Sequence, residues 1–172
     1  MTVTGTYLGM NLAIPENDEQ NLAYFQYCAT HDFRLQRCGN CHLLRYPPTT
    51  GCPWCMGMES EWHPVEGKGA VHSYGEVHHA IQPAWKAHTP YLFLLVDLDT
   101  QKGAPTEHDA LRVLANLVTA DGEPAPPELV RQVGIGTRVR MVFVDAGEGI
   151  AIPQWTMDQD AEQPPPWRYP QE

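Results

Sequence analysis

Apolar and polar positions along this chain recur mostly with the period of a β-strand, and only one longer segment has the period of a helix. Leu22, Phe25 and Cys28 are spaced by three residues, which predicts a helix over 19–29 with one buried face. A shorter helical segment is expected at 126–132. The opening residues are apolar without a clear period, so no element is predicted there. The remaining periodic segments predict strands at 33–37, 43–46, 61–65, 70–79, 90–98, 111–118, 139–144 and 149–155.

Two Cys-x-x-Cys pairs, separated by ten residues, are the strongest chemical signal: Cys38, Cys41, Cys52 and Cys55. This spacing predicts a structural zinc ribbon, in which four thiolates fill a tetrahedral shell and leave no position for water or substrate. Two alternatives stay open. One is a pair of disulfides, although nothing at the N-terminus indicates an oxidising compartment, and the other is rubredoxin-type iron. His42 follows the second ligand and could replace a sulfur, whereas Cys28 is expected to be a buried small hydrophobe.

The order of the predicted elements favours a mainly β protein. The last five strands, with glycine-rich turns and one short helical insertion, fit a five-stranded Greek-key barrel of the OB type. Disorder is expected for the acidic and proline-rich end of the chain, although Trp167 and Tyr169 suggest contact with a surface. The expected parts are an N-terminal segment with its helix at 1–33, a zinc ribbon at 34–66, an OB-fold at 67–157 and the tail at 158–172.

The composition limits the location and the partners. Of 172 residues, 11 are Lys or Arg and 21 are Asp or Glu, which gives a formal net charge of -10. That sign argues against nucleic acid as a partner, because such binding depends largely on cations that release phosphate counterions. A single-stranded nucleic-acid-binding protein stays the alternative, because ribbons and OB-folds often serve there. No apolar run approaches the roughly 20 residues of a membrane helix, so a soluble, cytoplasmic protein is expected.

Several short motifs, taken in order, carry a family resemblance. They are the run 35–41 that ends in Cys-Gly-Asn-Cys, Arg-Tyr-Pro-Pro at 45–48, Cys-Pro-Trp-Cys at 52–55, and the shorter matches at 61–62, 67–69, 90–91, 97–98, 133–136, 139 and 152–153. Over about residues 17–157 the chain resembles the acyl-CoA-associated zinc-ribbon/OB-fold family, long catalogued as domain of unknown function thirty-five. His42 and the insertion-like polar stretch at 100–109 depart from the commonest pattern of that family.

This resemblance implies a rubredoxin-like ribbon and an OB-fold that usually binds no nucleic acid. Members are companions of thiolases, of hydroxymethylglutaryl-CoA synthases or of thiolase-like retro-aldolases of sterol side-chain breakdown. A related companion serves the thiolase that cleaves benzoylsuccinyl-CoA. The catalytic residues lie on the partner. The resemblance therefore implies a non-catalytic accessory subunit that adds an interface and part of an acyl-CoA site to retro-Claisen or retro-aldol cleavage. A hetero-tetramer or larger assembly with a thiolase-like protein is expected.

Candidate site residues follow from that setting. Arg34, Arg37 and Arg45 are candidates for the phosphates of coenzyme A, because Arg offers forked donors; solvated strand faces or salt bridges are the alternative. Trp54 and Tyr91 are candidates for the partner interface. Four histidines are expected to be structural or interfacial rather than a second metal site or a general base: His72, His78, His79 and His88.

Overall fold

The computed structural model describes residues 2–170, and the fold is mainly β, as the sequence predicts. Contacts along the chain divide it into two units. The first unit contains the chain up to Gly67 together with 100–111 and 143–152, and the second contains 68–99, 112–142 and the chain from Pro153 onward. Within the described part of the chain, no helix combines the length and apolar character needed to cross a membrane.

An N-terminal hairpin opens the first unit, where the sequence predicts no element. Strands β1 (Thr2–Tyr7) and β2 (Met10–Pro15) pair antiparallel in continuous register. The two turn residues, Leu8 and Gly9, have φ values of 49° and 77°. Positive φ at both central positions is the geometry of a two-residue hairpin whose twist matches that of its strands. Leu is not a usual residue at such a turn, which is why the sequence conceals the hairpin.

Helix α1 (Glu19–Ala29) has the bounds that the apolar spacing predicts. The Asp18 side chain accepts a hydrogen bond from the backbone N–H of Asn21 and so caps the first turn. Tyr24 and Cys28 are buried on the inner face of the helix. Because Tyr24 lies edge-on to Phe33 with ring centroids 6.2 Å apart, the helix is packed beside the start of the ribbon.

The ribbon is a three-stranded antiparallel sheet. Its central strand β3 (Arg34–Cys38) pairs with β4 (Leu44–Arg45) on one side and β5 (Ser60–Pro64) on the other. All three strands are confirmed at positions close to the predicted ones, and β4 is shorter than expected. The strands place the two Cys-x-x-Cys segments in the connecting loops, where backbone groups can turn toward the sulfurs.

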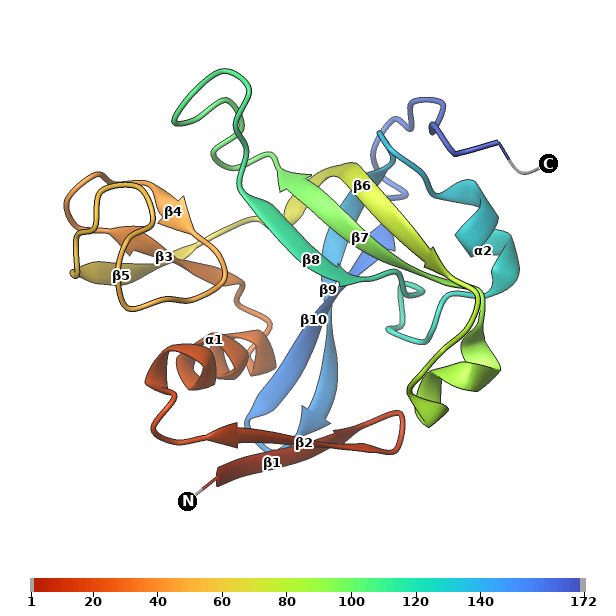
Figure 1. The fold of residues 1–172 in the computed structure, drawn as a ribbon, viewed down its shortest axis with the longest axis horizontal. Coiled ribbons are helices and arrows are strands. Elements are labelled where there is room, and N and C mark those ends of the chain that lie inside the picture. Colours follow the sequence, from red (N-terminus) through yellow and green to blue (C-terminus); the bar gives the residue numbers. More distant parts are fainter. Residues whose placement is uncertain (1, 171–172) are drawn as a thin grey trace. The chain divides into compact units, whose positions relative to one another are not determined.

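The remaining five strands form one antiparallel sheet in the order β10-β9-β6-β7-β8 (Figure 1). They are β6 (Lys68–Val77), β7 (Tyr91–Leu98), β8 (Arg112–Asn116), β9 (Arg138–Gly147) and β10 (Ile150–Met157). A parallel bridge between Leu117 and Trp155 joins the two ends of this order, which closes the sheet as in an OB-fold. The short helix α2 (Pro127–Gln132) lies between β8 and β9, as predicted, and an unpredicted 3-10 helix spans Pro83–His88.

The barrel core comes from one face of β7. Leu92, Leu94, Val96 and Leu98 are completely buried, and they alternate with residues on the opposite face of the strand. Trp155 on β10 is also fully buried, and its indole Nε1 donates to the carbonyl oxygen of Val113. The sequence presents this region as a continuous apolar run buried on both sides, but the structure leaves its second face partly exposed.

Candidate metal centre and interaction sites

Two similar turns bring the four ribbon cysteines together. His42 and Met56 each follow the second cysteine of a pair, and each has a positive φ, of 62° and 63°. Their backbone N–H groups donate to the carbonyl oxygens of Cys38 and Cys52, at 3.1 and 2.9 Å. Each Cys-x-x-Cys segment is therefore a compact turn that points both of its sulfurs the same way. We call these two turns the first knuckle (38–41) and the second knuckle (52–55). His42 serves as a turn residue, and the cluster consists of the four cysteines.

The distances between the sulfurs suit a tetrahedral metal ion. All four Sγ atoms lie within 4.8 Å of one another, and the Cys38–Cys55 and Cys41–Cys52 pairs are 3.6 Å apart. Zinc–sulfur bonds of about 2.3 Å place tetrahedral sulfurs roughly 3.8 Å apart, whereas a disulfide needs about 2.05 Å. The cluster could therefore hold a structural zinc ion. Bound zinc would cross-link the two knuckles, and its binding free energy would add to that of folding.

Backbone N–H groups around the sulfurs favour thiolates. The N–H of Cys41 is the largest influence that lowers the pKa of Cys38, to about 6, and the N–H of Gly57 lowers the pKa of Cys55. The N–H of Leu43 acts in the same direction on Cys41, but burial and the neighbouring thiols together raise the pKa of Cys41 to about 12. Thiolates this close repel one another, so the cluster needs a central cation before all four can ionise.

The fifth cysteine has a different environment. Cys28 is fully buried on the inner face of α1, and burial raises the pKa of its thiol to about 12. A thiol that stays protonated at neutral pH is a weak nucleophile. Cys28 is therefore a packing residue in this structure, consistent with the small hydrophobe that the sequence predicts.

Arg45 is buried inside the ribbon, with 1% of its surface exposed. Its Nε donates to Gln36 Oε1 at 2.9 Å, and its Nη2 donates to the carbonyl oxygen of Thr49 at 2.8 Å and to Ser60 Oγ at 3.0 Å. Gln36 Oε1 also accepts from the backbone N–H of Thr49. Arg45 therefore holds the loop between the knuckles onto the sheet, a role that its sequence position does not reveal.

Arg34 and Arg37 are more accessible, but they do not converge. Side chains three residues apart on a strand point to opposite faces of the sheet. The Nε of Arg34 donates to Asp32 Oδ2 at 2.6 Å, and its guanidinium lies over the Tyr27 ring at 5.1 Å. The Nε of Arg37 donates to the carbonyl oxygen of His42 at 3.3 Å. Binding of coenzyme A phosphates by these arginines stays a prediction.

The two interface candidates lie in different units. Trp54 lies at the tip of the second knuckle with 44% of its surface exposed, and Met56 and Met58 beside it are also exposed. Tyr91 begins β7, and its ring lies 4.6 Å from that of Trp85. Their role in an interface stays a prediction.

The histidines of the second unit are distributed singly. His72 Nδ1 lies 3.1 Å from Asp97 Oδ2, and His78 Nε2 lies 3.4 Å from Glu76 Oε1. His88 packs edge-on to Trp85, and His79 is exposed in the turn after β6. Because their partners differ, these four side chains do not make one site.

The sequence favours disorder for the C-terminal segment, but in the structure this segment lies along the second unit. We call the second unit, which contains most of the OB-fold, the OB unit. Trp167 and Ile135 exchange both backbone hydrogen bonds, each at 2.9 Å, as in a short antiparallel ladder. A Cβ atom on Gly134 would lie 2.3 Å from the carbonyl oxygen of Trp167, so the close approach needs glycine at that position. We call residues 158–170 the strap.

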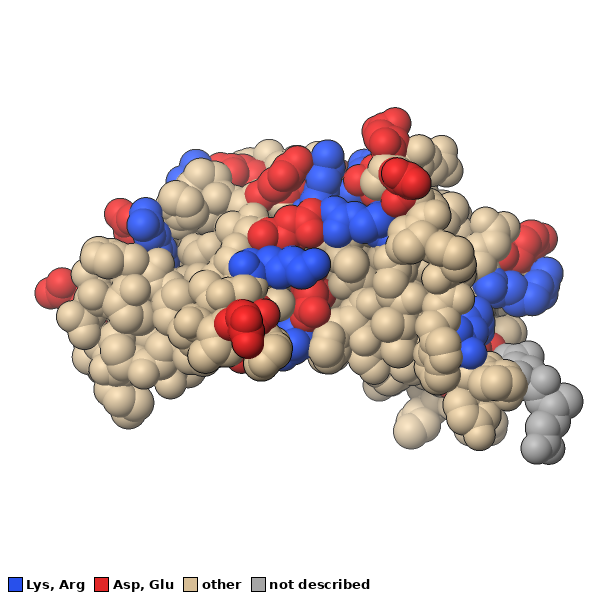
Figure 2. Space-filling view, turned by 90° about the horizontal axis from the view of Figure 1, so that it is seen from above, with Lys and Arg blue, Asp and Glu red and all other residues tan. Residues whose placement is uncertain are grey.

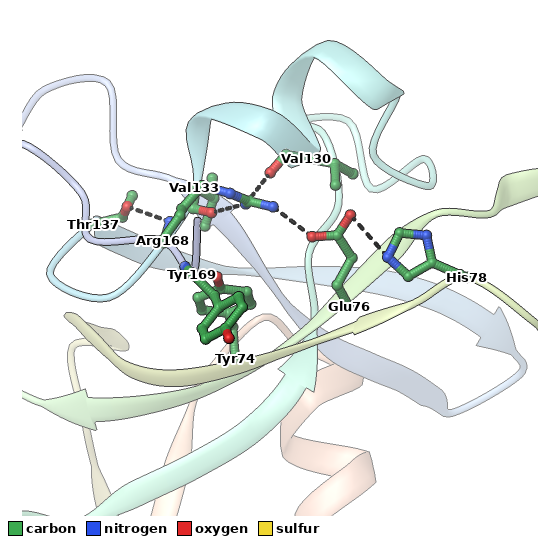
Figure 3. A network of polar contacts seen from close by, with 9 residues as sticks. Tyr74, Glu76, His78, Val130, Val133, Thr137, Arg168 and Tyr169 are labelled. Carbon is green, nitrogen blue, oxygen red and sulfur yellow. Dashed lines mark hydrogen bonds and ion pairs between the residues drawn. The ribbon is translucent and has the colours of Figure 1, made fainter. Parts of the chain in front are cut away.

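Arg168 anchors the strap (Figure 3). Its guanidinium donates to the carbonyl oxygens of Val130 and Val133 at the end of α2, and to the carboxylate of Glu76. It also lies 5.2 Å from the centre of the Tyr74 ring. The cation therefore meets three acceptors at a helix C-terminus, where positive charge is favoured. No local sequence pattern marks Arg168, because its partners are distant in the chain.

An apolar cleft of about 330 Å³ lies within the first unit. It is lined by residues of β2, α1 and β10, chiefly Leu12, Ile14, Phe25, Ile150 and Ile152. All the lining side chains are apolar. The cleft can therefore receive hydrocarbon, but its side chains offer no cation to a phosphate.

Comparison with known proteins adds to this geometry. The model for the C-terminal OB-fold domain of ChsH2 matches residues 62–144. A protein of Thermomonospora curvata, described as a probable enoyl-CoA hydratase alpha subunit, is 30% identical over 141 residues, which are 81% of this chain and 38% of that protein. The chain therefore spans less than two fifths of that relative.

A solved structure extends the likeness to a larger share of the chain. A chain of the structure described as "Ltp2-ChsH2(DUF35) aldolase" is 26% identical and superposes with a TM-score of 0.63, covering 83% of this chain and 98% of that one. A protein of unknown function from the DUF35 family of Sulfolobus solfataricus is 12% identical with a TM-score of 0.49, over 82% of this chain and 87% of that one. The first likeness runs over nearly the whole length of its match, and the family model matches the OB-fold, so together they support the DUF35/OB-fold family for this chain.

Proposed function

We propose that this chain is a non-catalytic accessory subunit of a thiolase-type complex that cleaves carbon–carbon bonds of acyl-CoA substrates. The observation that carries the proposal is the likeness to the DUF35 chain of an aldolase whose description has two components, Ltp2 and ChsH2. In this assembly the chain provides an interface and part of the acyl-CoA site, and the thiolase-like partner provides the catalytic residues. The assembly is a hetero-tetramer or larger.

The chemistry of the cysteines supports an accessory role. Four of them face one another in a cluster that a metal ion would saturate, and such a closed shell has no position for substrate. The fifth, Cys28, is buried, and its pKa is raised to about 12. None of these thiols is therefore suited to accept an acyl group from a thioester at neutral pH.

The charged side chains disfavour the nucleic-acid alternative. On the face drawn in Figure 2, Lys and Arg side chains lie among Asp and Glu side chains instead of forming a continuous basic surface. On the OB unit, Arg112 Nε lies 2.8 Å from Asp97 Oδ1, and Arg138 forms an ion pair with Asp99. Cations that are already paired within the chain release fewer counterions when a phosphate backbone binds.

The identity of the acyl group is the most specific part of the proposal. Retro-aldol cleavage of a sterol side-chain thioester and thiolytic cleavage of an aromatic, benzoylsuccinyl-type thioester both leave a CoA thioester as product. The apolar cleft of the first unit is compatible with either kind of hydrocarbon, since its lining side chains are apolar. A direct comparison of the two substrate classes in the assembled complex decides between them.

The experiment is co-expression with a thiolase-like protein encoded beside this chain, followed by gel filtration and a CoA-thioester cleavage assay. The proposal expects a stable complex that is active only when both chains are present. A chain that elutes alone and leaves the activity of the thiolase-like protein unchanged would refute it. Salt-sensitive binding of a single-stranded oligonucleotide would then support the nucleic-acid alternative.

A further inference from the structure

The outer face of the OB sheet, on β6, β7 and β8, has an apolar centre. Phe93 is 41% exposed and Leu114 is 51% exposed. Leu95 lies directly opposite Leu114 in the β7–β8 register and shares the face of β7 with Phe93. The three side chains therefore form one contiguous patch, which we call the OB-face patch. A single exposed leucine is common on protein surfaces, whereas a contiguous apolar patch indicates an interaction site.

Phe93 is held in place by the neighbouring strand. Gly75 on β6 lies opposite Phe93, and a Cβ atom on Gly75 would be only 2.0 Å from Phe93 Cζ. The far end of the ring therefore lies over Gly75, in the space that a side chain at that position would occupy. A fixed aromatic side chain loses little conformational entropy on binding, which favours it as an interface anchor.

Charged residues border the OB-face patch, and they are paired with one another. Asp97 follows Leu95 on the same face of β7, and it meets both Arg112 Nε at 2.8 Å and His72 Nδ1 at 3.1 Å. Arg138 forms an ion pair with Asp99 at the next position along this edge. The border is therefore polar but nearly neutral. This arrangement of an apolar centre within a polar rim is that of a protein–protein interface.

OB-folds often bind oligonucleotides through the strands that correspond to β7 and β8. Here that face carries the apolar side chains of Phe93, Leu95 and Leu114 in place of a basic groove, in a chain with a net charge of -10. A nucleic acid would meet Asp97 and Asp99 without an excess of cations to offset them. The complementary occupant is instead a protein surface that is apolar at its centre and has few unpaired charges.

We propose that the OB-face patch docks the thiolase-like companion subunit, and this inference rests on the proposed function. The companion contributes an apolar surface that covers Phe93, Leu95 and Leu114, and polar groups that meet the Asp97–Arg112 border. Tyr91 lies on the same face of β7 and extends the contact toward one end of the strand.

Leu114→Glu tests the assignment, because it puts a charge at the centre of the patch on a half-exposed position. The dissociation constant of the purified chain with the co-expressed thiolase-like protein is measured by calorimetry, and it is expected to rise about 30-fold or more, as for an interface hot spot. Ile81→Glu is the matched control, since Ile81 is 89% exposed and lies outside the patch. Its dissociation constant stays within about threefold of the original, which is a small effect on the free-energy scale. Unchanged circular dichroism and melting temperature establish that the variants fold.

If Leu114→Glu fails to fold, Leu114→Ala replaces it, and the affinity for the companion is expected to fall about fivefold to tenfold. A complex that tolerates the Leu114 change but is lost on Met58→Glu in the ribbon would overturn the assignment and place docking at the second knuckle. Binding of a single-stranded oligonucleotide that Leu114→Glu abolishes would also overturn it. If the unaltered chain forms no complex at all, the proposed function itself fails. A complex insensitive to Leu114 refutes only the docking surface.

Discussion

The side-chain amide of Gln101 pairs with the backbone of Leu44 as another strand would. Gln101 Oε1 accepts from the Leu44 N–H at 2.6 Å, and Gln101 Nε2 donates to the Leu44 carbonyl oxygen at 3.1 Å. Leu44 belongs to β4, an edge strand of the ribbon whose outer backbone groups would otherwise lack a partner strand. The polar stretch at 100–109, which departs from the common family pattern, thus supports the ribbon in this chain.

Gln101→Ala is expected to loosen β4 without unfolding the chain. The loss of two hydrogen bonds costs about 1–2 kcal/mol of unfolding free energy. Amide hydrogen exchange at Leu44 should become faster, and urea denaturation should show a lower midpoint. Lys102→Ala is the matched control, since Lys102 is an exposed neighbour in the same turn. Unchanged exchange at Leu44 in Gln101→Ala would contradict this role.

Acidification is expected to release the metal from the ribbon. The folded-state pKa of Cys38, about 6, is below its ordinary value of 9.0, so its ionised form stabilises the fold fully above pH 9 and less as pH falls through 6. Cys41, with a pKa near 12, must lose a proton when zinc binds at neutral pH. Zinc affinity should therefore fall steadily as pH is lowered. Zinc release between pH 8 and 5 can be followed with a chromogenic chelator.

Substitutions within the cysteine set provide the control for the metal site. Cys55→Ser is expected to reduce bound zinc from one equivalent toward none, because oxygen replaces a thiolate ligand. Cys28→Ala should keep one equivalent, since Cys28 lies outside the cluster. Metal analysis of both purified variants distinguishes the two cases. Iron in place of zinc, detected by its colour and by elemental analysis, would change the identity of the metal but leave the ligand set intact.

Arg45 and Arg37 should respond differently to substitution. Arg45→Lys keeps the charge but loses the forked donors to Gln36, Thr49 and Ser60, so unfolding free energy should fall by about 2 kcal/mol. Arg37→Ala should leave stability nearly unchanged. If Arg37 binds a coenzyme A phosphate, the KM of the assembled complex for its CoA thioester rises about tenfold, as for a charged hydrogen bond of about 1.4 kcal/mol. An unchanged KM would remove Arg37 from the candidate site.

The strap is expected to depend on its single cation, Arg168, whose side chain is 19% exposed. Arg168→Ala removes the ion pair with Glu76 and the bonds to two α2 carbonyl groups, at a cost of about 2–3 kcal/mol. Amides near Trp167 should lose their protection from exchange. Arg131→Ala on the exposed face of α2 is the control. Equal stability of both variants would mean that the strap does not contribute to the OB unit.

The features of this fold that the sequence predicts well are those that depend on short-range residue patterns. The spacing of Leu22, Phe25 and Cys28 predicts α1 at its observed bounds, and the order of five strands with one short helical insertion predicts the barrel. The cysteine spacing likewise predicts the four-sulfur cluster, because each Cys-x-x-Cys turn is local. The clustering of arginines expected from their closeness in sequence is not seen, since alternation along β3 separates Arg34 from Arg37.

Features held by distant partners could not be predicted. In the structure the threonines of β1 lie on its exposed face, but the hairpin turn has Leu8 at a positive φ, in the first central position, where Asn, Asp or Gly is usual. The strap is proline-rich, which favours disorder, and its order depends on Arg168 meeting Glu76, 92 positions away in the chain. In the strap the deciding interaction joins segments whose closeness no local pattern encodes.

The hairpin is held to the β9–β10 turn and the strand ends beside it, residues 146–150, by a close backbone contact. A Cβ atom on Gly5 would lie 2.0 Å from the carbonyl oxygen of Ala146 and 2.9 Å from Ile150 Cδ1. A Cβ atom on Gly147 would in turn lie 2.9 Å from Gly5 Cα. Because backbone atoms fill the space on both sides, neither strand can accept a methyl group without moving apart from the other.

Gly5→Ala is therefore expected to separate β1 from this turn, at a cost of about 2 kcal/mol or more. Gly9→Asn is the matched control: a Cβ at Gly9 meets open space, and Asn tolerates the positive φ of 77°. Urea denaturation should show a clearly lower midpoint for Gly5→Ala and a nearly unchanged one for Gly9→Asn. If instead Gly5→Ala is as stable as the original chain, the hairpin is not packed against the β9–β10 turn. The apolar cleft lined by Leu12 and Ile152 would then lose one of its walls.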